Sequence, residues 1–189
     1  MNKLLLIAAL VSAGAAQAGT IVDTGTPSGV GGYLLESNDS YAGQITLGAS
    51  LDITDIAAHV LGGNAGETFT ISVYTNAANN LPSSNALYGA SVTFGSDGWN
   101  GVSGKSWHLD AGTYWVAVEV GNADTLTPFA TLDYAAPNPL AVTAFNAGSG
   151  YRTSPLSFGL QISAVPEPAT YLLMLGGLAA LGLGSRRRG

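Results

Sequence analysis

A chain of 189 residues has room for one ordinary domain between targeting segments. The formal net charge is −6, but residues 19–163 hold eleven acidic and only two basic side chains, a formal charge of −9. This excludes nucleic acid as a partner, because binding it depends on basic side chains. The absence of cysteine excludes disulfides and thiol chemistry, and we expect neither a metal nor a cofactor.

The first eighteen residues predict a secretory signal peptide. A lysine near the start is followed by the short apolar run Leu4–Val11 and by small residues that end at Ala16 and Ala18. A positive start, an apolar middle and an Ala-x-Ala end are the pattern that signal peptidase cuts. We expect a signal helix that is removed after Ala18, so that the mature protein begins at Gly19 outside the cytoplasm.

Residues 19–163 alternate apolar and polar side chains, as half-buried strands do. The alternation is clearest at 68–74, 113–120 and 156–163. Further strands are expected at residues 44–47, 53–61, 88–94, 106–109, 126–134 and 141–145. Turns rich in glycine, asparagine and proline separate them. The sequence therefore predicts an antiparallel β-sandwich, and residues 109–118 resemble a strand common in jelly-roll domains of secreted bacterial proteins.

This stretch contains no recognised catalytic motif. There is no Gly-x-Ser-x-Gly, no His-Glu-x-x-His and no glycine-rich phosphate loop. Of its two histidines, His59 lies on the polar side of a strand beside Asp55, and His108 follows Trp107. Both are expected to be solvated. We expect a protein that is not an enzyme, with a hydrolase site assembled from distant residues as the alternative.

Trp99 and Trp115 are the candidate sugar-binding residues, because the flat face of an indole matches the C–H face of a pyranose. Trp99 lies in the glycine-rich segment 95–104, where its more ordinary role is to cover the end of the core. Trp115 lies on the polar side of its strand and could pair with Trp99 or Trp107. Calcium ligands are too sparse to predict a metal site, although Asp52 lies near Asp55 and Asn122 near Asp124.

The C-terminal residues predict a single transmembrane helix. Pro166, Glu167 and Pro168 precede an apolar run at 169–184, and three arginines, Arg186, Arg187 and Arg188, follow it. Sixteen helical residues span roughly 24 Å, which approaches the ~30 Å hydrocarbon core of a bilayer. The arginines should stay cytoplasmic and stop translocation, which leaves the preceding residues on the outer side.

This order of Pro-Glu-Pro motif, apolar helix and arginine cluster resembles the PEP-CTERM sorting signal of Gram-negative bacteria. The resemblance implies that Pro166, Glu167 and Pro168 are recognised by exosortase, a membrane transpeptidase that cuts near the motif. Two prolines should also keep the motif out of a helix and out of a sheet. Three parts are therefore expected: a signal peptide at 1–18, a β-sandwich at 19–163 and a sorting tail at 164–189.

These features predict an exported, non-catalytic surface or extracellular-matrix protein. Its precursor should be anchored in the inner membrane, and its processing partners should be signal peptidase and exosortase. Association with exopolysaccharide or biofilm is the further expectation. A carbohydrate-binding lectin, a structural coat component and a hydrolase with an unrecognised site are the alternatives. Exposed tryptophans would favour sugar binding, and buried tryptophans would favour a coat component.

Overall fold

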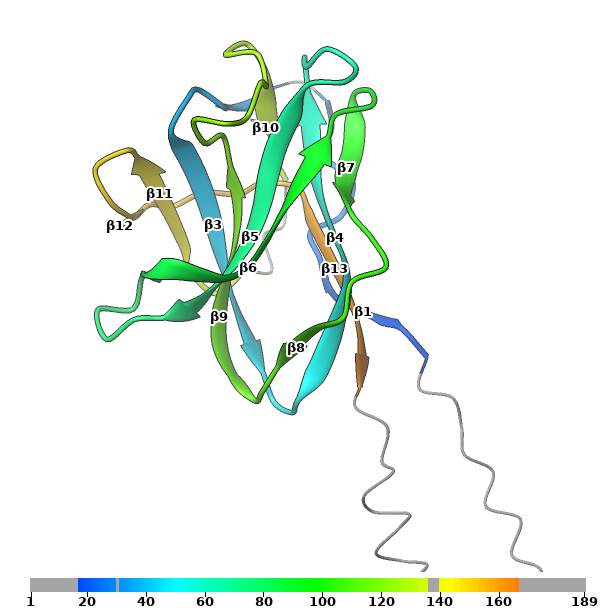
Figure 1. Ribbon diagram of the computed structural model, residues 1–189, viewed down its shortest axis with the longest axis vertical. Coiled ribbons are helices and arrows are strands. Elements are labelled where there is room, and N and C mark those ends of the chain that lie inside the picture. Colours follow the sequence, from blue (N-terminus) through cyan, green and yellow to red (C-terminus); the bar gives the residue numbers. More distant parts are fainter. Residues whose placement is uncertain (1–16, 30, 136–139, 167–189) are drawn as a thin grey trace, which may run out of the picture. The chain divides into compact units, whose positions relative to one another are not determined.

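The computed structural model describes residues 17–29, 31–135 and 140–166, which form two antiparallel sheets (Figure 1). The expected signal helix and C-terminal membrane helix lie outside these residues. Within the described part of the chain there is no helix long and apolar enough to cross a membrane. All of the regular structure there is strand, which confirms the prediction of an all-β antiparallel body.

The first sheet, called sheet A, is built around its longest strand, β4. Along one edge β4 pairs with β13 and then β10, and along the other it pairs with β8 and β7. β1 extends the sheet beyond β13, and β2 extends it beyond β10. The bounds are β1 Gly19–Asp23, β2 Gly32–Leu34, β4 Leu51–Leu61, β7 Gly98–Val102, β8 Trp107–Leu109, β10 Thr131–Asp133 and β13 Leu160–Pro166.

The second sheet, called sheet B, has six strands in the order β12-β11-β3-β9-β5-β6. Its central strand β9 pairs with β3 in an unbroken register that places Ser40 opposite Glu119. On its other edge β9 pairs with β5, which places Thr70 opposite Glu119. The bounds are β3 Asp39–Leu47, β5 Thr68–Asn76, β6 Pro82–Thr93, β9 Gly112–Glu119, β11 Thr143–Ala147 and β12 Arg152–Thr153.

The main core lies between the two sheets, because one buried cluster takes its side chains from both. Ile56 and Ile162 come from sheet A, and Phe69, Ile71 and Val116 come from sheet B; all five are 0 % exposed. Burial of such apolar side chains is the main driving force for packing one sheet on the other. Because side chains alternate along a strand, every second residue of sheet B points away from this core.

Four strands were not expected from the sequence, and β7 is the most informative. Residues 95–104 were expected to be a glycine-rich loop, yet Gly98–Val102 pairs with β4. A Cβ atom at Gly101 would lie 2.1 Å from the carbonyl oxygen of Ile56. Glycine is therefore needed here for close approach of two strands, although it usually marks a turn. β13 also continues to Pro166, beyond the expected end at 163.

Candidate functional site

The outer face of sheet B carries a second apolar cluster. Ala42, Ala117 and Ala144 lie side by side on β3, β9 and β11, and each is 0 % exposed. Trp115 belongs to the same cluster, and Tyr74, Leu81, Val142 and Tyr151 pack against it. Because alanine side chains are short, larger side chains can pack directly over these three strands. Sheet B therefore has a covered outer face.

Trp115 is buried in this cluster at 0 % exposure. Its Nε1 donates a hydrogen bond of 2.8 Å to Asn76 Oδ1, and Leu81, from the turn between β5 and β6, packs against the cluster. The interpretation of Trp115 as a candidate sugar-binding residue is corrected, because the buried indole has no free face to offer a sugar. Nor does it pair with Trp99 or Trp107, which belong to strands of sheet A.

Trp99 is partly buried on β7, where it meets His59 of β4 edge to face, with ring centroids 5.1 Å apart. The expectation that His59 is solvated is wrong, because the residue is only 8 % exposed. Its Nδ1 lies 3.0 Å from Oδ2 of Asp133 on β10, and Asp133 is fully buried. Trp99 packs against the imidazole, and no local pattern in the sequence predicts this environment.

The His59–Asp133 pair is incompletely hydrogen-bonded. Asp133 Oδ2 accepts a bond of 3.0 Å from the backbone N–H of Gly29. His59 Nδ1 is close to the same oxygen but not in hydrogen-bond geometry, and among the described residues neither His59 Nδ1 nor Asp133 Oδ1 has a hydrogen-bond partner. Among the described residues no serine or threonine hydroxyl contacts the imidazole, so a nucleophile–histidine–carboxylate arrangement is not formed there.

His108 differs from His59 because it is exposed. Its Nδ1 lies 3.0 Å from Asp52 Oδ1, and its Nε2 lies 3.6 Å from Asp110 Oδ1. Within the part of the chain that the structure describes, no group of three or more His, Cys, Asp or Glu side chains is arranged to bind a metal. The Asp124 carboxylate accepts hydrogen bonds from Thr70 Oγ1 and from the N–H of Gly121.

The main concentration of polar contacts surrounds the carboxylate of Glu119, on the outer face of sheet B. Four hydroxyl groups from three separate segments donate to it. Glu119 Oε2 accepts from Ser72 at 2.6 Å, and Oε1 accepts from Tyr74 at 2.7 Å, Tyr151 at 3.0 Å and Ser40 at 3.1 Å. The hydroxyls of Ser40 and Tyr151 also lie within hydrogen-bonding distance of each other. Because each carries one proton, only two of the three contacts among Ser40, Tyr151 and Glu119 form at one time. Glu119 therefore fixes the positions of two tyrosine rings.

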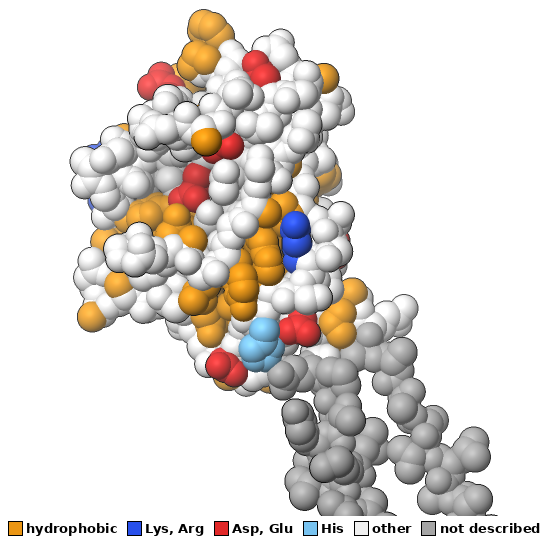
Figure 2. All heavy atoms as spheres, in the orientation of Figure 1, with side chains coloured by type: hydrophobic (Ala, Val, Ile, Leu, Met, Phe, Trp, Pro, Cys, Tyr) orange, Lys and Arg blue, Asp and Glu red, His pale blue; other side chains and the backbone are white. Residues whose placement is uncertain are grey.

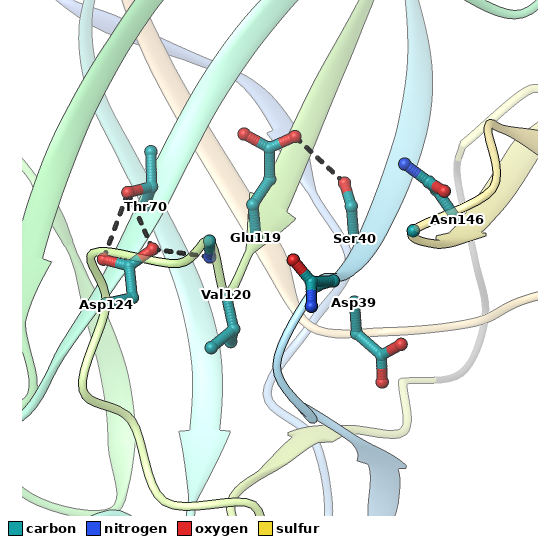
Figure 3. A pocket seen from close by; sticks show the side chains of 10 residues that line it. Asp39, Ser40, Thr70, Glu119, Val120, Asp124 and Asn146 are labelled. Atoms are coloured by element: carbon teal, nitrogen blue, oxygen red, sulfur yellow. Dashed lines mark hydrogen bonds between the residues drawn. The ribbon is translucent and has the colours of Figure 1, made fainter.

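Two adjoining pockets open on either side of this carboxylate, and together we call them the Glu119 trough. Their volumes are about 280 and 420 Å³, and both are lined by Glu119 and Asn146. In Figure 3 Ser40 points toward Glu119 and Thr70 toward Asp124, whereas the Asp39 carboxylate points away. The first pocket is also lined by Asn38, Asp39, Ser40, Thr70, Asp124 and Gly148, and the second by Tyr74, Asn79, Ser83, Ser84 and Tyr151.

Burial raises the pKa of both tyrosines of the trough. For Tyr151 and for Tyr74 desolvation is the largest cause, and the negative charge of Glu119 adds to it. Both phenols therefore stay protonated and keep donating to the carboxylate at neutral pH. Burial also raises the pKa of Asp39, although the hydrogen bond from the Glu36 backbone acts in the opposite direction.

These raised pKa values predict loss of stability at high pH. An unfolded tyrosine has a pKa of about 10, and the pKa is raised above this in the fold for Tyr41, Tyr74 and Tyr151. The stabilisation is fully present below pH 10 and is lost as the pH rises toward the folded pKa values. Tyr151→Phe should therefore reduce the alkaline fall in unfolding free energy, by up to about 1.4 kcal/mol per pH unit.

Urea unfolding of the mature protein at neutral and alkaline pH measures this fall in stability. The phenylalanine variant should be less stable at neutral pH by about 1 kcal/mol, because it loses the hydrogen bonds of the phenol. The two curves of stability against pH should then converge above pH 10. Parallel curves would show that ionisation of Tyr151 is not coupled to folding.

The comparisons with known proteins concern the C-terminal residues. Residues 164–188 match the family described as the PEP-CTERM protein-sorting motif. The chain carries an exosortase sorting signal. The PEP-CTERM motif marks it as an exported surface protein, made as a membrane-anchored precursor and processed for the cell surface. A search of curated proteins found no match to the chain.

The structure reaches the first residue of the Pro-Glu-Pro motif, Pro166. Pro166 ends β13 opposite Leu51, so the expectation that the prolines hold the motif out of the sheet is wrong for this residue. β1 pairs with β13 only as far as Ala164, which leaves that edge of β13 without β1 at Pro166. A proline is tolerated at such a position. Glu167, Pro168, Ala16 and the three arginines lie outside the described residues, and Ala18 directly precedes β1.

Proposed function

We propose that the protein is a non-catalytic surface or extracellular-matrix protein that associates with exopolysaccharide through the Glu119 trough. The sorting signal supports the location, because it delivers the body to the side of the envelope where polysaccharide accumulates. The trough supports the binding, because hydroxyl, amide and carboxylate groups line it beside two tyrosine rings. Such convergent polar groups around aromatic surface suit a hydroxyl-rich ligand.

The hydroxyl network around Glu119 is the observation that carries this proposal. Tyr74 and Tyr151 are held by the carboxylate before any ligand arrives, with ring centroids 6.0 Å apart. A rigid site loses less conformational entropy on binding than a mobile one. Because both phenol protons are already engaged within the network around Glu119, sugar hydroxyls would donate to the phenol oxygens.

The non-catalytic part of the proposal rests on the same carboxylate. Hydroxyl groups surround both oxygens of Glu119 and already hydrogen-bond to them, which does not favour proton transfer from this carboxyl group to a substrate. A structural coat component is the second candidate function, and the burial of Trp115 favours it. In that case the mature protein would assemble with itself and would bind no glycan.

Glycan binding should depend on the ring of Tyr151. We expect Tyr151→Ala to weaken binding of the mature protein to its preferred polysaccharide about tenfold, since losing an aromatic contact and a hydrogen bond costs about 1.4 kcal/mol. A glycan array finds the ligand, and titration calorimetry with a soluble oligomer of it measures the affinity.

Phe129→Ala is the matched control for this experiment. Its side chain is 81 % exposed, lies in the loop before β10 of sheet A and lines neither pocket of the trough. Its removal should leave the affinity unchanged. Thermal melts of both variants separate a lost contact from a lost fold. Equal losses from the two substitutions, or no binding to any glycan on the array, would refute the proposal.

A further inference from the structure

The ionisable groups that line the Glu119 trough are all acidic. Asp39, Glu119 and Asp124 line the two pockets, and within the part of the chain that the structure describes no lysine, arginine or histidine does. Asp39 contributes least, because it is 8 % exposed and its carboxylate points away from Glu119 (Figure 3). Asp124 lies at the side of the trough, where Thr70 and the N–H of Gly121 hold its carboxylate.

The two basic side chains of residues 19–163, Lys105 and Arg152, both contact aromatic rings that do not line the trough. The ammonium of Lys105 lies 5.9 Å from the ring centroid of Trp107, next to strand β8 of sheet A. The guanidinium of Arg152 lies 5.3 Å from the ring centroid of Phe145, whose side chain packs against the main core. Figure 2 likewise shows a face with several acidic side chains and few basic ones. Among the described residues, no cation therefore lines the trough to offset a negative charge brought into it.

From this charge pattern we infer that the Glu119 trough takes glycans without acidic groups, whether neutral or amino-substituted, and excludes glycans that bear carboxylates or sulfates. The inference rests on the proposed function and specifies its ligand class. Sugar hydroxyl and amino groups can donate to the acceptor oxygens of the trough. A uronic acid would instead bring a second negative charge beside Glu119 or Asp124, where protein walls weaken the screening by solvent.

Matched oligomers test the inference directly. The mature protein is titrated with cello-, chitosan and alginate oligomers of equal length at physiological salt. We expect a neutral or amino-substituted oligomer to bind and the alginate oligomer to bind at least about tenfold more weakly. Asp124→Asn should reduce this difference in affinity between the alginate oligomer and the other oligomers severalfold. Asp110→Asn removes the same charge from an exposed position outside the trough and should leave the difference unchanged.

A gain-of-function pair guards against variants that merely fail to fold. Ser84 is exposed and lines the larger pocket, so its side chain can be enlarged without entering the core. Ser84→Lys should raise the affinity for the alginate oligomer about tenfold, because it places a cation at the trough. Ser84→Gln, of similar length and no charge, should not.

The outcomes separate this inference from the proposed function. Failure of every oligomer and every arrayed glycan to bind would overturn the proposed function. The alginate oligomer could instead bind as tightly as the neutral oligomers, with this binding lost in Tyr151→Ala. That result would support the proposed function and overturn the inference. An alginate affinity that does not respond to Ser84→Lys would also overturn it, since charge in the trough would then not decide the ligand class.

Discussion

Replacing Pro166 and Pro168 with alanine should leave most of the protein as an uncleaved precursor in the membrane fraction. Proline fixes φ and lacks a backbone donor, so the two residues limit how far a strand or a helix can continue through the motif. β13 reaches Pro166 and is paired with β4 up to that residue. Alanine at both positions removes the limit and lets regular structure extend over the residues that we expect exosortase to recognise.

The intact mass of the protein released from the surface measures the processing. Pro155→Ala is the control, because it removes an exposed proline from the loop between β12 and β13 and leaves the motif unchanged. It should be processed like the wild type. Replacement of Arg186, Arg187 and Arg188 should act differently, by weakening the stop in translocation. If wild-type protein at the surface still carried residues 169–189, the tail would be an anchor only.

The strands that sequence predicts best are those with one face on the core. Phe69, Ile71 and Val73 alternate with polar residues and are each 0 % exposed on β5. The alternation is a local consequence of strand geometry, so a short window of sequence contains it. The sorting motif is equally predictable, because it is a continuous pattern within residues 164–188.

The candidate site was not predictable in the same way. Glu119 contacts Ser40, Ser72 and Tyr74 only because β3 and β5 pair with the two edges of β9 in the observed register. It contacts Tyr151 because the residue before β12 lies next to these strands. Each of these side chains is an ordinary polar residue in its own strand. The one available signal was Glu119, which lies on the polar side of the valine-rich strand β9. A carboxylate in that position usually indicates a solvated surface.

Long-range packing also explains the errors for His59 and Trp115. The sequence placed Trp115 on the polar side of its strand, and the structure does place it on the outer face of sheet B. Its burial depends on Leu81 and Tyr151, which come from other parts of the chain. His59 likewise meets Asp133 only because β10 pairs with the end of β4. The alternation of apolar and polar residues predicts on which face of a sheet a side chain lies, but it does not predict which other segments cover that face.

Trp115→Ala should lower the free energy of unfolding by about 3–5 kcal/mol, the usual cost of removing a large buried aromatic side chain. The indole is 0 % exposed and lies over a floor of short side chains that cannot fill the space it leaves. Its loss would also deprive Asn76 Oδ1 of the 2.8 Å bond from Nε1, although Gln44 donates to the same oxygen at 3.3 Å. Urea unfolding of the mature protein measures the change.

Two comparisons show whether Trp115 acts through the fold. Trp115→Phe keeps a ring and loses the N–H donor, so it should cost less than Trp115→Ala. Phe129→Ala removes an aromatic side chain that is 81 % exposed and should change stability by less than about 0.5 kcal/mol. A sugar-stacking tryptophan at the surface would show the opposite pattern, in which the alanine variant keeps its stability and loses affinity. A cost below about 1 kcal/mol for Trp115→Ala would therefore contradict its place in the covered cluster of sheet B.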